Sequence, residues 1–236
     1  MAAKKPASIA VIEAAEASAT RLDRWKSSLL RRDSAPSGSL DSFLSTELSA
    51  AAIVACMAEL EGLIRGFLVS LAEQINGSRT RIRDLNPKLR SIAGHAHFES
   101  LATSEDKDNI WLRRLKVTSF ESDYDIVMFP IASRGKPQPP LDGRTITPEH
   151  IHRIWVVLDL AADPFPDPAC VASLRKLAGL RNDIAHCNYP IDEVFAGPGV
   201  SRDEIVGYLD DMVLFILHLS TVWSEYSLSR SYLLKQ

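Results

Sequence analysis

Apolar residues recur every three or four positions along most of the chain, which is the spacing of amphipathic α-helices. A first helix is expected over residues 7–32, and its predicted apolar positions are Ile9, Ile12, Leu22, Trp25 and Leu29. Residues 40–76 carry a longer apolar run that ends at Asn76-Gly77, a helix-stop signal. Two shorter helices are expected between residues 78 and 120.

Proline and capping residues mark where the later helices begin. Thr147-Pro148 and Asp167-Pro168 each place a capping side chain before a first-turn proline. Ser201 and Glu204 match a capping box, and the helix that follows is expected to run to about Tyr232. Its segment MVLFILHL, residues 212–219, is too short to cross a membrane and predicts a buried helix face.

These elements predict an all-α fold of five to seven helices. Pro36 and Gly38 separate an N-terminal helical arm and linker, residues 1–39, from a helical domain, residues 40–236. A long irregular loop is expected near residues 123–147, which are rich in proline and glycine. The segment DYDIVMFPI, at the start of this loop, is the one strand candidate.

Charge and cysteine content argue against a dedicated duplex-binding protein and against a secreted, disulfide-bonded protein. The net charge is -3 and the sequence pI is about 6.1, which excludes the global basic field of a dedicated duplex binder. The odd number of cysteines, Cys56, Cys170 and Cys187, and their lack of CxxC spacing favour a reduced, cytoplasmic compartment. Glu13 and Glu16 interrupt any signal-peptide core, and no membrane span is expected.

One polar cluster interrupts the apolar helices, in the stretch LAGLRNDIAHCNYP. Asn182 and His186 are four residues apart and share a helix face, while Arg181 lies about 140° around the axis from His186. The arginine side chain is long enough to bend across that angle. An apolar stripe on the same helix consists of Leu177, Leu180 and Ile184.

These residue types allow two interpretations. A histidine can take a proton from a ribose 2′-hydroxyl or give one to a leaving 5′-oxygen, while an arginine holds the phosphate. Alternatively, Arg181 and His186 cap carbonyl groups and complement the dipole at the end of the helix. Spacing alone favours this structural role.

The string Arg181-Asn182-Asp183-Ile184-Ala185-His186 resembles the R-N-x-x-A-H signature of the HEPN superfamily. It lies on a late helix that is followed by a loop and one more long helix, as in that family. A second similarity is an acidic residue in an early helix, which Glu61-Gly62 matches best and for which Glu59 competes. The resemblance covers residues 40–232.

The resemblance implies an HEPN-like helical bundle that acts as a metal-independent RNA endonuclease, without a cofactor. Two copies would form a homodimer whose motifs face one cleft. The enzyme would act in toxin–antitoxin or anti-phage defence systems and would have an antitoxin or defence protein as its partner. Arg181 would bind phosphate, His186 would act as acid and base, and Asn182 would orient His186 or touch RNA. Glu61 would position Arg181 or His186, and Asp183 would be a surface residue.

The chain departs from the family pattern directly after the motif. Many members have glycine after the histidine, whereas this chain has Cys187 followed by Asn188. Because asparagine tolerates a left-handed backbone, the turn is expected to shift by one residue. Some family members do not cleave RNA, so the alternative function is a non-catalytic helical adaptor or a nucleotide-binding module.

The remaining polar groups have mostly ordinary interpretations. Between residues 79 and 90, five basic residues against Asp84 give a net charge of +4, which predicts a solvated face or, if the protein cuts RNA, a strand-holding patch. The five are Arg79, Arg81, Arg83, Lys88 and Arg90. The histidines at 95, 97, 150 and 152 are expected on the surface or in loops rather than on a metal, and His218 in the core. The four tryptophans are expected to be core or interface anchors.

Overall fold

The computed structural model describes residues 7–31, 39–102, 110–119, 125–132, 137–198 and 200–234. In these ranges the chain forms helices and no strand, so the all-α prediction is confirmed. The helices are α1 (Ala7–Leu30), α2 (Ser39–Gly77), η2 (Ile82–Asp84), η3 (Pro87–Leu89), α3 (Arg90–Ala93), α4 (His95–Ala102), α5 (Ile110–Ser119), α6 (Pro148–Leu158), α7 (Pro168–His186), α8 (Ile191–Val194) and α9 (Arg202–Leu228).

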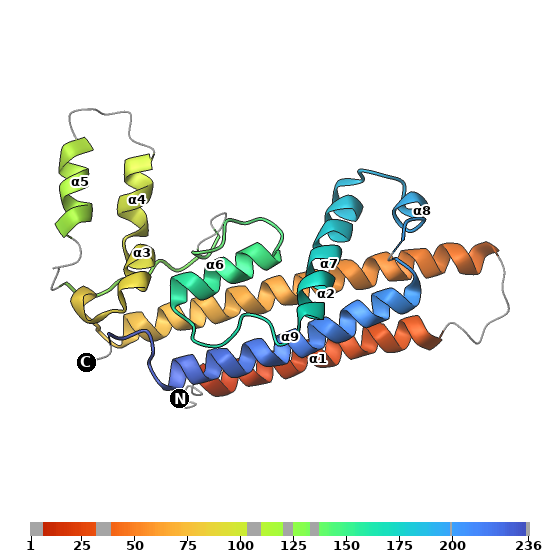
Figure 1. Ribbon diagram of the computed structural model, residues 1–236, viewed down its shortest axis with the longest axis horizontal. Coiled ribbons are helices and arrows are strands. Elements are labelled where there is room, and N and C mark those ends of the chain that lie inside the picture. Colours follow the sequence, from red (N-terminus) through yellow and green to blue (C-terminus); the bar gives the residue numbers. More distant parts are fainter. Residues whose placement is uncertain are drawn as a thin grey trace, which may run out of the picture.

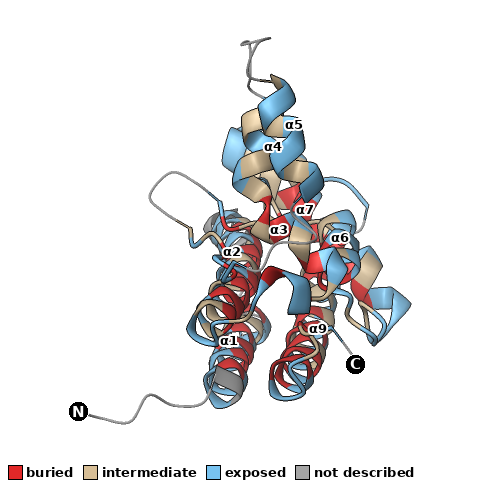
Figure 2. Ribbon diagram, turned by 90° about the vertical axis from the view of Figure 1, so that its left-hand side faces the viewer, coloured by how far each residue is buried: buried red, intermediate tan, exposed pale blue. Residues whose placement is uncertain are grey.

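Three long helices, α1, α2 and α9, lie lengthwise beside one another and hold much of the core. Figure 1 shows α1 running in the opposite direction to α2 and α9, and Figure 2 shows the buried faces of the three turned inward. Polar contacts fix the ends of this bundle. Arg202 Nη1 donates to the Leu29 carbonyl at 3.2 Å, and Gln74 Nε2 donates to the Ser227 carbonyl at 3.1 Å.

The buried face of α1 differs from the predicted one. Ile9 and Ile12 are 46% and 40% exposed, whereas Leu22 and Leu29 are buried as expected. The face that packs on α9 and α2 consists of Val11, Ala15, Ser18, Ala19, Leu22 and Leu29. Three of these six residues are small, and small side chains allow helix backbones to approach closely. Arg32, Pro36 and Gly38 lie outside the described residues.

The last helix, α9, begins at the predicted capping box but ends earlier than expected. Ser201 Oγ accepts from Glu204 N at 3.3 Å, and Glu204 Oε2 accepts from Ser201 N at 3.0 Å. The helix ends at Leu228 rather than near Tyr232, because Arg230 takes a left-handed backbone with φ of 51°. Ser231 N then donates to Tyr226 O, which closes the helix end.

By length and composition alone α9 could cross a membrane, with a mean hydropathy of 1.6 over its most apolar window. The same helix buries residues at the i, i+3, i+4 and i+7 positions of the MVLFILHL segment, as expected of a core helix: Met212, Phe215, Ile216 and Leu219. His218, on this helix, is partly buried, and its Nε2 lies 2.8 Å from the Asp163 carbonyl. The absence of a membrane span stays a prediction.

Helix α7 crosses the long bundle, and α6 lies beside the bundle and runs roughly along α2 (Figure 1). Both begin where the sequence predicts, after Thr147 and Asp167, and Asp167 Oδ1 accepts from Ala169 N at 2.7 Å. Leu177 and Leu180 are buried and Ile184 packs against the core, so the apolar stripe of α7 is confirmed. Packing on α2 and α9 therefore holds α7 by its leucines and leaves its other face for polar groups.

Helices α4 and α5 form a hairpin that stands away from one end of the bundle (Figures 1 and 2). Neither helix has a fully buried residue, and Trp111 on α5 is 66% exposed, so this tryptophan is not a core anchor. The strand candidate forms no strand among the described residues, because its pairing stops at one antiparallel bridge between Ile126 and Arg81.

Candidate functional site

The predicted motif lies at the carboxyl-terminal end of α7, where the helix extends beyond the long bundle toward α8 (Figure 1). Arg181 and Asn182 are partly buried, and His186 is exposed. None of these three side chains is sealed in the interior. A phosphate group in solvent can therefore reach the imidazole of His186.

Asn182 connects Arg181 to the loop before α6. Asn182 Oδ1 accepts from Thr145 Oγ1 at 2.8 Å and from Arg181 Nη1 at 3.4 Å. Thr145 was not among the predicted site residues, because it lies 37 residues from Asn182 and no local signal in the sequence links the two. Its hydroxyl holds the amide whose oxygen meets the Arg181 guanidinium, and thereby limits where that guanidinium can point.

The turn after the motif does not shift by one residue as expected. Cys187 itself takes the left-handed backbone, with φ of 50° and ψ of 39°. Cys187 N donates to Ile184 O at 3.4 Å and Asn188 N donates to Asp183 O at 3.2 Å, which are the two bonds of a Schellman motif. Because these bonds fix the position of the turn, cysteine occupies the place where the family pattern has glycine. His186 is the last helical residue.

The end of α7 is fixed by side chains as well. Asn188 Nδ2 donates to Asp183 Oδ1 at 3.1 Å across the turn. Asp183 was predicted to be a surface residue only, but it is partly buried and pins the segment that follows His186.

Within one chain, the described contacts do not join Arg181 to His186 or either of them to Glu61. One carboxylate oxygen of Glu61, on α2, is buried without a hydrogen-bond partner. Its competitor Glu59 binds α1 instead, with Oε2 accepting from Ser18 Oγ at 2.9 Å and from Arg21 Nη2 at 2.6 Å. The hydrogen bonds from Arg21 hold the pKa of Glu59 below its usual range. Glu59 therefore stabilises the contact between α1 and α2, whereas one oxygen of the Glu61 carboxylate has no hydrogen-bond partner.

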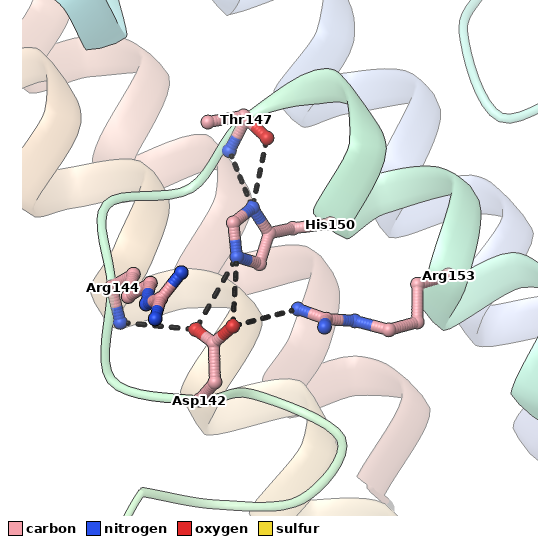
Figure 3. Close-up of polar contacts among 5 residues, drawn as sticks. All are labelled: Asp142, Arg144, Thr147, His150 and Arg153. Atoms are coloured by element: carbon pink, nitrogen blue, oxygen red, sulfur yellow. Dashed lines mark hydrogen bonds and ion pairs between the residues drawn. The ribbon is translucent and has the colours of Figure 1, made fainter.

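A second polar cluster lies beside the motif, around His150 (Figure 3). Its Nδ1 accepts from Thr147 N at 3.3 Å and lies 2.8 Å from Thr147 Oγ1, while its Nε2 lies 3.3 Å from both oxygens of Asp142. The His150 side chain is only 13% exposed, so the prediction of a surface or loop histidine is wrong for this residue. It instead caps α6 and ties that helix to the loop.

Asp142 gathers several donors in the same cluster. Arg144 N donates to Asp142 Oδ1 at 3.1 Å, and Arg153 Nη2 donates to Oδ2 at 3.3 Å (Figure 3). Burial works to raise the pKa of Asp142, but the Arg144, Arg153 and His150 donors outweigh it and lower the pKa to about 2. The loop between residues 137 and 147 is therefore anchored to both α6 and α7.

The predicted RNA-binding segment lies at the far end of α2 from the crossing with α7 (Figure 1). Three of its members, Lys88, Arg90 and Arg83, have local partners. Lys88 Nζ pairs with Asp159 at 2.5 Å, and Arg90 Nη2 donates to the Arg83 carbonyl at 3.0 Å. Arg83 itself pairs with Asp84 at 3.5 Å. The remaining two members, Arg79 and Arg81, line a cavity of about 440 Å³.

Two further cavities lie away from the motif. One, of about 530 Å³, is bordered by Asp159 and Tyr226, and another, of about 470 Å³, by Arg21 and Glu59. Neither Arg181 nor His186 lines these three cavities. Across the described ranges, no group of three His, Cys, Asp or Glu side chains is placed to hold a metal ion.

No family model matches this chain, and comparisons with curated proteins and with solved structures give no match. The resemblance to HEPN proteins therefore depends on the residues of α7 and on Glu61 alone. What the structure adds is the exposure of His186, the Thr145 contact to Asn182 and the buried, unpartnered oxygen of Glu61.

Proposed function

We propose that this protein is a metal-independent RNA endonuclease of the HEPN type. One observation carries the proposal: an exposed imidazole, His186, and a hydrogen-bonded guanidinium, Arg181, lie at one solvent-facing helix end. A histidine can exchange protons near neutral pH, and an arginine can bind two phosphate oxygens at once. Together these groups supply what a ribose phosphodiester needs for internal cleavage.

The proposed reaction is an in-line transfer within the RNA. His186 takes the proton of a 2′-hydroxyl, and the 2′-oxygen attacks the adjacent phosphorus. Arg181 stabilises the negative charge that develops on the phosphoryl oxygens. The bond to the 5′-oxygen breaks, and that oxygen takes a proton from a second imidazole or from water. The products are a 2′,3′-cyclic phosphate and a 5′-hydroxyl.

A homodimer fits this chemistry better than one chain does. Arg181 and His186 lie about 140° apart around α7 and are not in contact, so one motif supplies an incomplete site. Two motifs facing one cleft would bring an arginine of one copy toward a histidine of the other. Glu61 then offers an unpaired carboxylate oxygen to position either group. Free RNA cleavage harms a host cell, so an antitoxin or defence partner is expected to control the activity.

The test is incubation of purified protein with total RNA, followed by mapping of product ends. The unsubstituted chain is expected to leave 2′,3′-cyclic phosphate and 5′-hydroxyl ends in the presence of a chelator. Arg181→Ala and His186→Ala are expected to lower the rate by about 10²-fold or more while the protein stays folded. His95→Ala and Arg24→Ala are matched controls on α4 and α1 that should leave cleavage unchanged.

Three results would contradict the nuclease. They are cleavage that survives His186→Ala, cleavage that stops with the chelator, and products with 3′-hydroxyl ends. If the unsubstituted chain does not cleave RNA and the motif variants change only stability, the alternative holds. In that case α7 belongs to a non-catalytic adaptor or nucleotide-binding module, and Arg181 and His186 cap carbonyl groups and complement the dipole at the end of the helix.

A further inference from the structure

Three arginines from two distant parts of the chain line one cavity at the end of the bundle where α2 and α9 finish. Arg79 and Arg81 follow α2, and Arg230 follows α9. The cavity has a volume of about 440 Å³, and all three arginines are exposed. Arg230 lies 140 residues beyond Arg90, so the sequence pattern that predicted a basic segment did not include it.

The three guanidinium groups have no partner among the described residues, unlike their neighbours. Lys88 and Arg90 are bound to Asp159 and to carbonyl groups. Asp84, the one acidic residue among those that line the cavity, pairs with Arg83 at 3.5 Å. Like charges gathered in one hollow repel each other, and an anion with several oxygens would remove that repulsion.

Two of these arginines occupy backbone positions that favour glycine. Arg79 has φ of 53° and Arg230 has φ of 51°, and each lies two residues beyond the end of a long helix, α2 or α9. Non-glycine residues are strained in this left-handed region, and such strain concentrates at functional positions. Both residues turn the chain at the rim of the same cavity, so the two strained positions bring two arginines to one site.

We propose that Arg79, Arg81 and Arg230 bind backbone phosphates of single-stranded RNA. Arginine forks match phosphate oxygens, whereas the Ser78 and Thr80 hydroxyls on the same rim are bound to the Ile75 carbonyl and to each other, so the three guanidinium groups are the donors that remain. This inference rests on the proposed nuclease function and deepens it. The cluster holds the strand at a distance from the α7 motif, and it replaces the five-residue patch expected from the sequence.

The competing explanation is local. Cations near a helix carboxyl terminus complement its dipole, and Arg79 and Arg230 occupy such positions. That role predicts a change in thermal stability and no change in RNA affinity. Binding and stability must therefore be measured on the same variants.

The experiment measures anisotropy of a labelled single-stranded RNA on the full chain carrying His186→Ala, which protects the probe from cleavage. Arg79→Ala, Arg81→Ala and Arg230→Ala are each expected to weaken binding about tenfold. The triple variant is expected to lower the slope of log affinity against log salt by about 2. Arg24→Ala, an exposed arginine on α1, is the matched control and should bind normally. Inorganic phosphate as competitor should displace RNA only weakly.

Loss of affinity confined to the three arginines, with an unchanged Arg24→Ala variant, supports the inference. Affinity equal to that of Arg24→Ala, with only the melting temperature altered, overturns it. Inorganic phosphate that binds the cluster as tightly as RNA does overturns the assignment to RNA. Cleavage by the unsubstituted chain is scored separately. Intact cleavage without arginine-dependent binding overturns only this inference, whereas arginine-dependent binding without cleavage overturns only the nuclease.

Discussion

Several residues at helix ends adopt a backbone conformation that side chains with a Cβ atom disfavour. Cys187 is the one beside the candidate site, and it closes α7 where glycine would be relaxed. The others are Arg79, Asp159 and Arg230. Each position holds a helix end in a defined place at some cost in stability, and the cost can be measured residue by residue.

Cys187→Gly is expected to stabilise the fold by up to about 1 kcal/mol, because glycine removes the Cβ clash at φ of 50°. Denaturant unfolding measures the change. Cys187→Ala keeps the Cβ atom and is the matched control, with an expected change within about 0.5 kcal/mol. A Cys187→Gly variant less stable than Cys187→Ala would show that the turn is not strained.

The Asp142 carboxylate predicts a specific response to acid. Its pKa is lowered from 3.8 to about 2, so the folded state favours its charged form. The stability it contributes is complete above pH 3.8 and is lost as the pH falls toward 2. Unfolding midpoints measured from pH 5 to pH 2 should therefore fall more steeply for the unsubstituted chain than for Asp142→Asn. Parallel curves would contradict the lowered pKa.

At the scale of elements, the loop before α6 links two helices that the sequence treats as separate. Thr145 reaches Asn182 on α7, while Asp142 binds His150 and Arg153 on α6. Proline- and glycine-rich loops are commonly read as exposed connections, but this one is held at both helices by side chains. The orientation of the Arg181 guanidinium thus depends on a loop that lies outside its own helix.

Thr145→Val keeps the shape of the side chain and removes the hydrogen bond to Asn182. If Arg181 acts on phosphate, turnover is expected to fall about tenfold while KM changes little, because the guanidinium loses its fixed orientation. Thr145→Ser restores the hydroxyl and should restore turnover. The stability cost should stay near 1 kcal/mol. Equal turnover in the Val and Ser variants would remove Thr145 from a positioning role.

At the scale of the whole molecule, α1 shares one hydrophobic core with α2 and α9. Leu22 and Leu29 of α1 are fully buried in the same cluster as Leu60 of α2 and Phe215 of α9. Arg21 and Lys26 add ion pairs to Glu59 and Asp210 at the edges of this contact. The first helix therefore contributes to the stability of the bundle as directly as the later ones do.

Leu22→Ala is expected to destabilise the protein by about 2–5 kcal/mol, the usual cost of a cavity in a core. Ile12→Ala, on the exposed side of the same helix, should change stability by less than about 0.5 kcal/mol. Thermal and denaturant unfolding of the two variants compares them directly. Similar losses of stability in the two variants would show that Ile12 is buried, as the sequence pattern predicted.

Local signals predicted the helices well. Periodic leucines and the caps at Thr147, Asp167 and Ser201 placed the starts of α6, α7 and α9, because these signals act over a few residues. The face of α1 was misassigned, since its alanines fit either side of the helix and only the neighbouring helices decide which side is buried. The end of α9 was misplaced because the left-handed position is occupied by Arg230, and not by the glycine or asparagine that usually signals such a turn.

The polar surroundings of the candidate site were largely beyond sequence reasoning. Thr145 and Asn182 are 37 residues apart, and nothing in either local sequence indicates their contact. His150 looked like a surface histidine because its partner Asp142 lies in a loop without periodicity. The motif itself could be found because Arg181 and His186 lie close together in the sequence on one helix. The residues that hold it, such as Thr145, are brought to it only by tertiary packing.

The three cysteines of the chain differ sharply in their access to solvent. Cys56 and Cys170 are buried, and burial raises the pKa of their thiols to about 12 and about 11, whereas Cys187 is exposed. Thiol reagents act on accessible thiolates, so a maleimide fluorophore should attach at Cys187 alone. The native chain thus offers a ready labelling position one residue from His186, where a dye would report directly on whatever molecule docks at that end of the helix.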